Sequence, residues 1–165
     1  GYIYSRASGD GFDSNGNITV SGGTLLVCGP TSGGNGIFDY GDSGCSFTHT
    51  GGIIFGMGTS DMAVYPNSTY ISANGTLSAN SIIAVADSSG KTLAALTVPA
   101  DMNMSGLVIF SNTSASSSTY SIYSGATYSG TLDSHGYGTG GTITGGTKLT
   151  AGSGSSGGGR TNPWG

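Results

Sequence analysis

The stretch that decides the fold is NITVSGGTLLV, residues 17–27: a short strand, a Gly-Gly pair and a second short strand. The phrase returns as SFTHTGGIIF at residues 46–55, with its Gly-Gly pair 29 residues further on, and again as GTITGGTKLT at residues 141–150. Glycine accepts the left-handed backbone angles of a sharp corner and lets neighbouring segments approach closely. A recurring strand–corner–strand unit is typical of a β-solenoid, whose coils stack on one another. Ordinary hairpins with glycine turns are the alternative.

The composition also favours strands over helices. The 165 residues include 33 glycines but no Glu or Gln, and only 7% are charged. Residues that build long helices are therefore scarce, whereas Thr, Val, Ile and Tyr are common. The hydrophobic fraction is 35% and is gathered in short bursts, which argues against a disordered chain. The sequence predicts an all-β protein.

The chain divides into four segments by pattern. In its middle, two apolar runs flank the turn signal Ser88-Ser89-Gly90, and two further strand-like runs follow at 105–111 and 119–123. The predicted segments are β-helix coils at 1–63, an inserted antiparallel β-sandwich-like module at 64–123, a returning coil at 124–151, and a Gly/Ser-rich tail at 152–165.

Charge and motifs exclude several functions. The formal net charge is −4 with no basic patch, so nucleic acid is not an expected partner. No stretch approaches the roughly 18 apolar residues of a membrane span. Because the sequence starts directly in a strand-like run, we expect a processed product. His49 and His135 are isolated, and no nucleophile elbow, phosphate loop or zinc spacing occurs, so we predict a protein that is not an enzyme.

Cysteines and sequons point to an extracellular location. Cys28 and Cys45 are the only cysteines, and an even count in such a chain favours one disulfide, with two buried free thiols as the alternative. Asn-X-Ser/Thr triplets are candidate glycosylation sites in a secreted protein, although they also arise by chance in a chain this rich in Asn, Ser and Thr. They lie at Asn17, Asn67, Asn74, Asn103 and Asn112.

The densest polar cluster is GDGFDSNGN at residues 9–17, echoed by NGIFDYGD at residues 35–42. In stacked coils equivalent positions lie about 4.8 Å apart, which would place Asp13 beside Asp39 and Asp10 near Asn35. Carboxylates so close repel each other unless a cation lies between them, and calcium accepts six to eight oxygen ligands. The alternative is a set of side chains that hydrogen-bond their own turns.

The runs GDGFDSNGNITVSGGT (9–24), GPT (29–31) and GNGIFDY (34–40) resemble a family of secreted bacterial β-helix proteins described as carbohydrate-binding domain-containing proteins. Later pieces, such as TYSIYSG at 119–125, are similar to it in the same order, so that the likeness covers most of residues 1–150. The resemblance implies a right-handed parallel β-helix with bound calcium and affinity for acidic polysaccharide of the polygalacturonate type. The family's calcium motif falls here on Asp10, Asp13, Asn15 and Asp39. A partly coordinated calcium ion would bridge acidic protein and acidic glycan.

Two functions follow as hypotheses. The first is a non-catalytic, calcium-dependent carbohydrate-binding protein of the extracellular surface. The second is a self-assembling subunit of an extracellular filament or surface layer, a homo-polymer joined head-to-tail through open β edges and the terminal segments. The candidate assembly residues are Tyr2, Tyr4 and Trp164.

Overall fold

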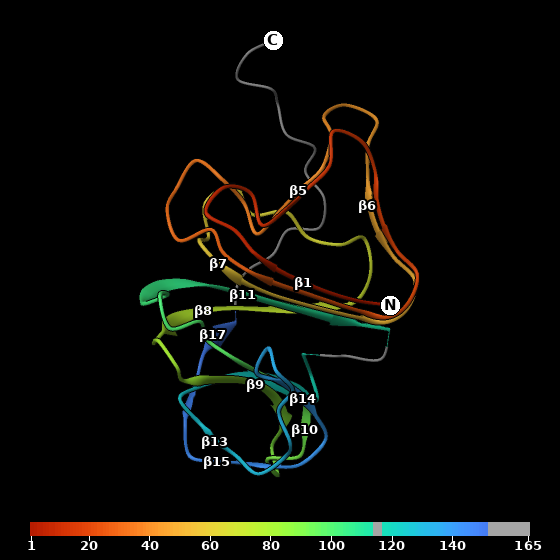
Figure 1. The fold of residues 1–165 in the computed structure, drawn as a ribbon. Helices are drawn as coiled ribbons and strands as arrows, with labels where there is room; N and C mark the ends of the chain where they lie inside the picture. Colours follow the sequence, from red (N-terminus) through yellow and green to blue (C-terminus); the bar gives the residue numbers. More distant parts are fainter. Residues whose placement is uncertain (114–116, 152–165) are drawn as a thin grey trace.

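The computed structural model describes residues 1–113 and 117–151, and these contain strands but no helix. The strands form several sheets, none of them closed, so the predicted all-β class is confirmed (Figure 1). Within the described ranges there is accordingly no helix long and apolar enough to cross a membrane.

The strands of residues 1–58 pair in parallel and in register. β1 (Tyr2–Arg6) pairs with β4 (Thr24–Cys28), and β4 pairs with β7 (Ile53–Gly58). Two shorter parallel pairs complete this part of the fold: β2 (Phe12–Asp13) with β5 (Phe38–Asp39), and β3 (Ile18–Val20) with β6 (Phe47–His49). The two repeats found at residues 17–27 and 46–55 therefore lie side by side.

The Gly-Gly pairs form corners between these strands, as expected. Gly23 and Gly52 have φ angles of 79° and 86°, in the left-handed region that favours glycine. A Cβ atom on Gly52 would also lie 2.7 Å from the carbonyl carbon of Gly22 in the corner below. Both the backbone angle and the close approach of the two corners explain why glycine recurs here.

The same sheet continues beyond β7 with antiparallel strands. β11 (Met104–Asn112) pairs with β7, β8 (Tyr70–Leu77) pairs with β11, and β17 (Thr150–Ala151) pairs with β8. The order is β1-β4-β7-β11-β8-β17. Strands of the predicted module at 64–123 and strands of the predicted coils thus share one six-stranded sheet.

A second, five-stranded sheet is antiparallel throughout. Its order is β14 (Tyr137–Thr139), β10 (Thr92–Thr97), β9 (Ile82–Asp87), β12 (Tyr120–Ser124) and β16 (Thr147–Lys148). The predicted hairpin around Ser88-Ser89-Gly90 is confirmed as the pairing of β9 with β10.

The prediction of a returning coil at 124–151 is wrong. β13 (Thr127–Tyr128) pairs antiparallel with β15 (Ile143–Thr144), and β14, β16 and β17 also pair antiparallel with their neighbours. The corner at Gly145-Gly146, with φ angles of 65° and 81°, leads from β15 into β16 rather than between stacked coils. A local corner motif therefore does not determine which strand its flanks pair with.

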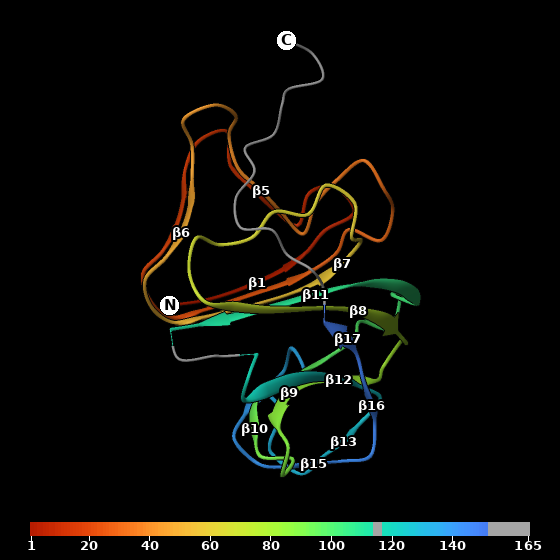
Figure 2. The same ribbon diagram turned by 180° about the vertical axis from the view of Figure 1, so that it is seen from behind.

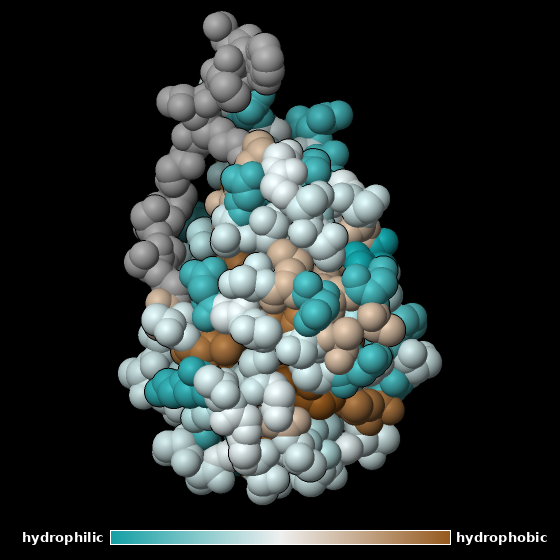
Figure 3. All heavy atoms as spheres, turned by 90° about the vertical axis from the view of Figure 1, so that its left-hand side faces the viewer, coloured by the Kyte–Doolittle hydropathy of each residue, from teal (hydrophilic) through white to brown (hydrophobic). Residues whose placement is uncertain are grey.

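The six-stranded sheet contributes to a core on each of its faces, since adjacent side chains of a strand point to opposite sides. Leu25 and Ile54 join a core inside the N-terminal strands, whereas Leu26 and Phe55 join a core against the second sheet. The outer face of the second sheet is alanine-rich and is covered by β13 and β15. Figures 1 and 2 show the resulting layers from opposite sides. The face seen in Figure 3 is mostly polar or neutral, with hydrophobic atoms in small patches.

Candidate functional site: the open end of the N-terminal strands

Three strands at one end of the N-terminal part are outermost in their sheets. β1, β2 and β3 each have one edge that no strand of the described residues pairs with. We call this surface, formed by β1 to β3, the open end. At the ends of β1, the Gly1 carbonyl accepts from Thr24 N–H and Ala7 N–H donates to the Cys28 carbonyl. Because bonding direction alternates along a strand, the N–H and C=O groups of Tyr2, Tyr4 and Arg6 point outward.

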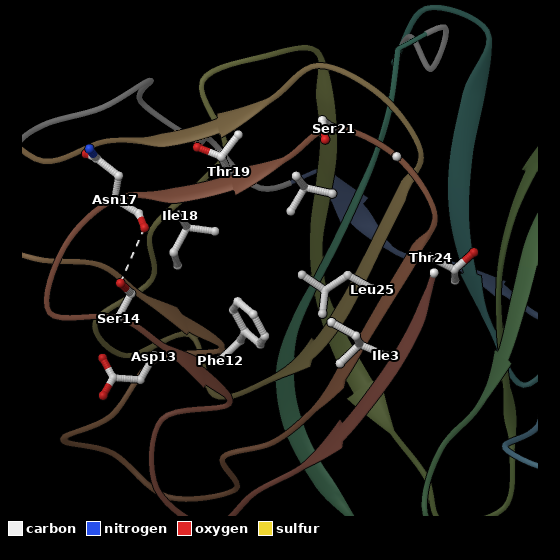
Figure 4. Close-up of a pocket in the computed structure, with 13 residues that line it drawn as sticks. Ile3, Phe12, Asp13, Ser14, Asn17, Ile18, Thr19, Ser21, Thr24 and Leu25 are labelled. Atoms are coloured by element: carbon white, nitrogen blue, oxygen red, sulfur yellow. Dashed lines mark hydrogen bonds between the residues drawn. The ribbon is translucent and has the colours of Figure 1, made fainter.

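A hollow of about 490 Å³ lies at the open end, and both apolar and polar residues line it. In Figure 4 the side chains of Ile3, Phe12, Ile18 and Leu25 point toward its centre, while Asp13 points away. Ile3 is 51% exposed, although the residues beside it in the next strands, Leu25 and Ile54, are buried. At this end Ile3 is therefore exposed to solvent, whereas Ile18 and Leu25, which also line the hollow, are each 3% exposed.

The opposite end of the same core is covered. Ala63, Val64 and Tyr65 pack against it, and Asn67 forms a parallel bridge with Thr48 of β6. The second edge of β7 is paired with β11. The two ends consequently differ: the described residues close one of them, and at the other they leave the outward backbone groups of β1 unpaired beside the hollow.

β1 is fixed to the second half of the chain by its outward side chains. The Tyr2 hydroxyl donates to Asp133 Oδ2 at 2.7 Å, and Tyr4 stacks on His135 with ring centroids 4.6 Å apart. Arg6 Nη2 lies 2.9 Å from Asp101 Oδ2. Burial and the neighbouring Cys28 thiol raise the pKa of Tyr4 to about 12. Free edge groups are thus carried by a strand whose position is well fixed.

Asp133 is held by a turn that occurs twice in the chain. The sequences DSSGK at 87–91 and DSHGY at 133–137 fold alike: the Asp Oδ1 accepts from the N–H groups two and four residues later. Partial burial by itself would raise the pKa of Asp133, but the hydrogen bonds from Tyr2 and from the Tyr137 and His135 N–H groups lower it overall. Asp133 is therefore an anchored carboxylate beside the Tyr2 end of β1.

The predicted calcium residues are only partly brought together. Asp13 and Asp39 lie opposite each other on β2 and β5, as expected from stacked coils. Asp10 Oδ1 instead accepts a hydrogen bond from Gly36 N–H at 2.6 Å, which is the turn-stabilising role, and Asn15 is exposed. Among the described residues no group of three or more His, Cys, Asp or Glu side chains could hold a metal ion. These residues alone do not make a calcium cage, which needs six to eight oxygens.

The predicted disulfide does not form. Cys28 and Cys45 are both free thiols. Cys28 is buried in the core between the two large sheets, whereas Cys45 lines a small cavity of about 60 Å³ near Tyr40 and Val64, beside the other core. The six-stranded sheet that contains Cys28 therefore lies between the two cores with which these thiols are associated.

The remaining predicted residues take varied positions. Asn17 Oδ1 accepts from Ser46 N–H at 2.8 Å and so joins the ends of the two repeats. Asn67, Asn74 and Asn103 are exposed, and Asn112 is half-buried at the end of β11. Trp164 lies outside the described residues.

A buried histidine–serine pair has no signal in the sequence. His49 is 3% exposed, and its Nδ1 lies 2.8 Å from Ser111 Oγ. Since Ser111 donates its hydroxyl hydrogen to the Thr69 carbonyl, its oxygen accepts from Nδ1–H of His49. Ser111 is fully buried and therefore out of reach of a substrate. The pair joins β6 to β11 across 62 residues of sequence, and no local sequence pattern predicts this contact.

The chain was compared with known protein families, curated proteins and solved structures. No family model, curated protein or solved structure matches this chain.

Proposed function

We propose that the chain is a non-catalytic structural protein of an extracellular assembly, which it joins by accepting a β-strand of a partner at the open end. The observation that carries the proposal is the coincidence of outward backbone groups on β1 with the hollow of about 490 Å³ and the exposed Ile3 side chain beside them. An exposed strand edge pairs readily with another chain. Main-chain hydrogen bonds would supply affinity, and alternate apolar side chains of the partner would fill the hollow.

The proposal includes an architecture for residues 1–67. We interpret them as the end of a short right-handed parallel β-helix. The in-register pairing of β1, β4 and β7, and of the two shorter pairs, supports this interpretation. A β-helix with an uncovered end is a natural acceptor, because a further strand continues both its ladder and its core.

The test is binding of a strand peptide. A labelled peptide with the sequence GGTLLV, copied from residues 22–27, is titrated with the protein and followed by fluorescence anisotropy. We expect saturable binding that Ile3→Lys weakens by about tenfold or more, because an ammonium group would replace the apolar side chain that the partner strand covers. Met62→Lys is the matched control, since Met62 is 39% exposed on the segment that leads into the covered end. Absence of binding, or equal weakening by both variants, would contradict the proposal.

A second candidate function is favoured by the pairing of Asp13 with Asp39. We propose, as the alternative, calcium-mediated binding of an acidic polysaccharide, with glycan carboxylates completing a ligand set that the chain leaves incomplete. Calorimetric titration of polygalacturonate with and without calcium tests it. The alternative requires binding only with calcium and its loss in Asp13→Asn, with Asp42→Asn as the exposed control. Calcium-independent or absent binding would rule it out.

A further inference from the structure

We propose that the partner at the open end is a second copy of this chain, with β1 of each copy pairing antiparallel about a two-fold axis at Tyr4. This inference rests on the proposed function, because it names the occupant of the same surface. It predicts a closed dimer, in which the same surface is used twice.

The head-to-tail arrangement expected from the sequence lacks a free strand on one side. The second edge of β7 is taken by β11, and Ala63, Val64 and Tyr65 cover the far side of the core. Within the described residues, the parallel part therefore has one uncovered end. The surface that offers the matching combination of an outward strand edge and an exposed Ile3 is the open end of another copy.

The backbone of β1 is self-complementary about Tyr4. Its outward residues are Tyr2, Tyr4 and Arg6, spaced evenly on the two sides of Tyr4. In an antiparallel pair, opposed outward residues exchange two hydrogen bonds. Tyr4 then pairs with Tyr4 of the other copy, and Tyr2 pairs with Arg6 in both directions. All the outward N–H and C=O groups of these three residues are satisfied, which leaves no exposed edge on β1.

Side chains agree with the same register. Ile3 of one copy lies opposite Ser5 of the other, both on the side of the hollow, so that the two hollows adjoin and the exposed Ile3 side chains become covered. Charge also matches. The Arg6 end of one β1 meets the Tyr2 end of the other, where Asp133 is anchored. Four of the five guanidinium N–H groups of Arg6 bond within their own copy, which leaves the fifth for this carboxylate.

Sedimentation velocity over a concentration series measures the assembly. We expect the mass to rise from 16.2 kDa to twice that value and then to stop rising. Ile3→Lys should weaken dimerisation by about tenfold or more, because the ammonium groups would be buried without a partner. Met62→Lys, changed at the other end, should leave the dimerisation constant unchanged.

A mixing experiment fixes the register. Ile3→Cys and Ser5→Cys are prepared separately in a Cys45→Ser background and then combined under mild oxidation. Directly opposed residues in this pairing have Cα atoms about 4.5 Å apart, within the range of a disulfide. We expect a cross-linked heterodimer from the mixture and little cross-linking from either variant alone.

The outcomes separate this inference from the proposed function. A protein that stays monomeric yet binds the strand peptide keeps the proposed function and overturns the two-fold dimer, as does an open-ended polymer. A dimer that Ile3→Lys leaves intact, or that cross-links through Ile3→Cys alone, also overturns it. A protein that neither dimerises nor binds the peptide would contradict both the proposed function and the two-fold dimer.

Discussion

The clearest quantitative prediction concerns two neighbouring leucines on β4. Leu25 is 3% exposed in the core of the N-terminal strands, and Leu26 is 0% exposed in the core between the large sheets. Replacing either residue with alanine removes buried methyl groups and leaves a cavity, at a cost of about 2–5 kcal/mol. Total stabilities of domains are about 5–15 kcal/mol, so each variant should lose a large part of the free energy of unfolding.

Urea denaturation followed by far-ultraviolet circular dichroism and by tyrosine fluorescence checks this prediction. Because one sheet serves both cores, we expect each variant to lower the midpoint in a single transition that both probes report alike. Thr19→Ala, on the exposed side of β3, should change stability by no more than about 0.5 kcal/mol. A loss below about 1 kcal/mol for Leu25→Ala alone, or a transition that splits in two, would refute a shared sheet.

Three further predictions use the same denaturation assay. Gly52→Ala should cost more stability than Gly44→Ala: both have φ of 86°, but a Cβ at Gly52 meets backbone of the adjacent corner and one at Gly44 meets nothing within 4 Å; equal losses would count against the close approach of the corners. Ser111→Ala should cost about 1–3 kcal/mol because it removes the shorter, 2.8 Å partner of His49 Nδ1 and leaves only the Ser68 hydroxyl at 3.4 Å. A neutral effect would contradict the importance of the Ser111 hydrogen bond. Burial raises the pKa of the Cys28 thiol from 9.0 to about 11, so the free energy of unfolding should be unaffected by this thiol below pH 9 and should fall as pH rises from 9 to 11. Cys28→Ala should show a smaller fall over that interval, and an equal fall in both proteins would show that other groups cause it.

Local patterns predicted much of the fold. Alternation of apolar and polar residues and turn chemistry identified the β9–β10 hairpin and the strands β11 and β12, because these signals depend on a few adjacent residues. The Gly-Gly repeat identified the parallel pairing of β4 with β7, because glycine is required where two corners approach.

Pairing partners were harder to predict than strands. The third Gly-Gly phrase has the expected corner at Gly145-Gly146, yet the strands that flank it pair antiparallel, β15 with β13 and β16 with β12. The antiparallel extension of the N-terminal sheet by β11 and β8 likewise depends on contacts distant in sequence.

The candidate site was predicted in part. The sequence named Tyr2 and Tyr4 as assembly residues and expected open β edges, and both residues lie on β1, whose outer edge pairs with no strand of the described residues. Their contacts with Asp133 and His135 span about 130 residues and have no local signal. Asp13 and Asp39 were correctly placed side by side, but Asp10 was assigned to calcium although its carboxylate bonds Gly36 N–H.

The most direct test of the central claim, that the open end accepts a β-strand, is residue-resolved amide hydrogen exchange along β1, with and without the GGTLLV peptide and at low and high protein concentration. The account predicts that the outward amides of Tyr2, Tyr4 and Arg6 gain protection when a partner binds, while Ile3 and Ser5, already bonded to β4, change little. Uniform protection along β1, or none at Tyr2, Tyr4 and Arg6 under any of these conditions, would contradict it.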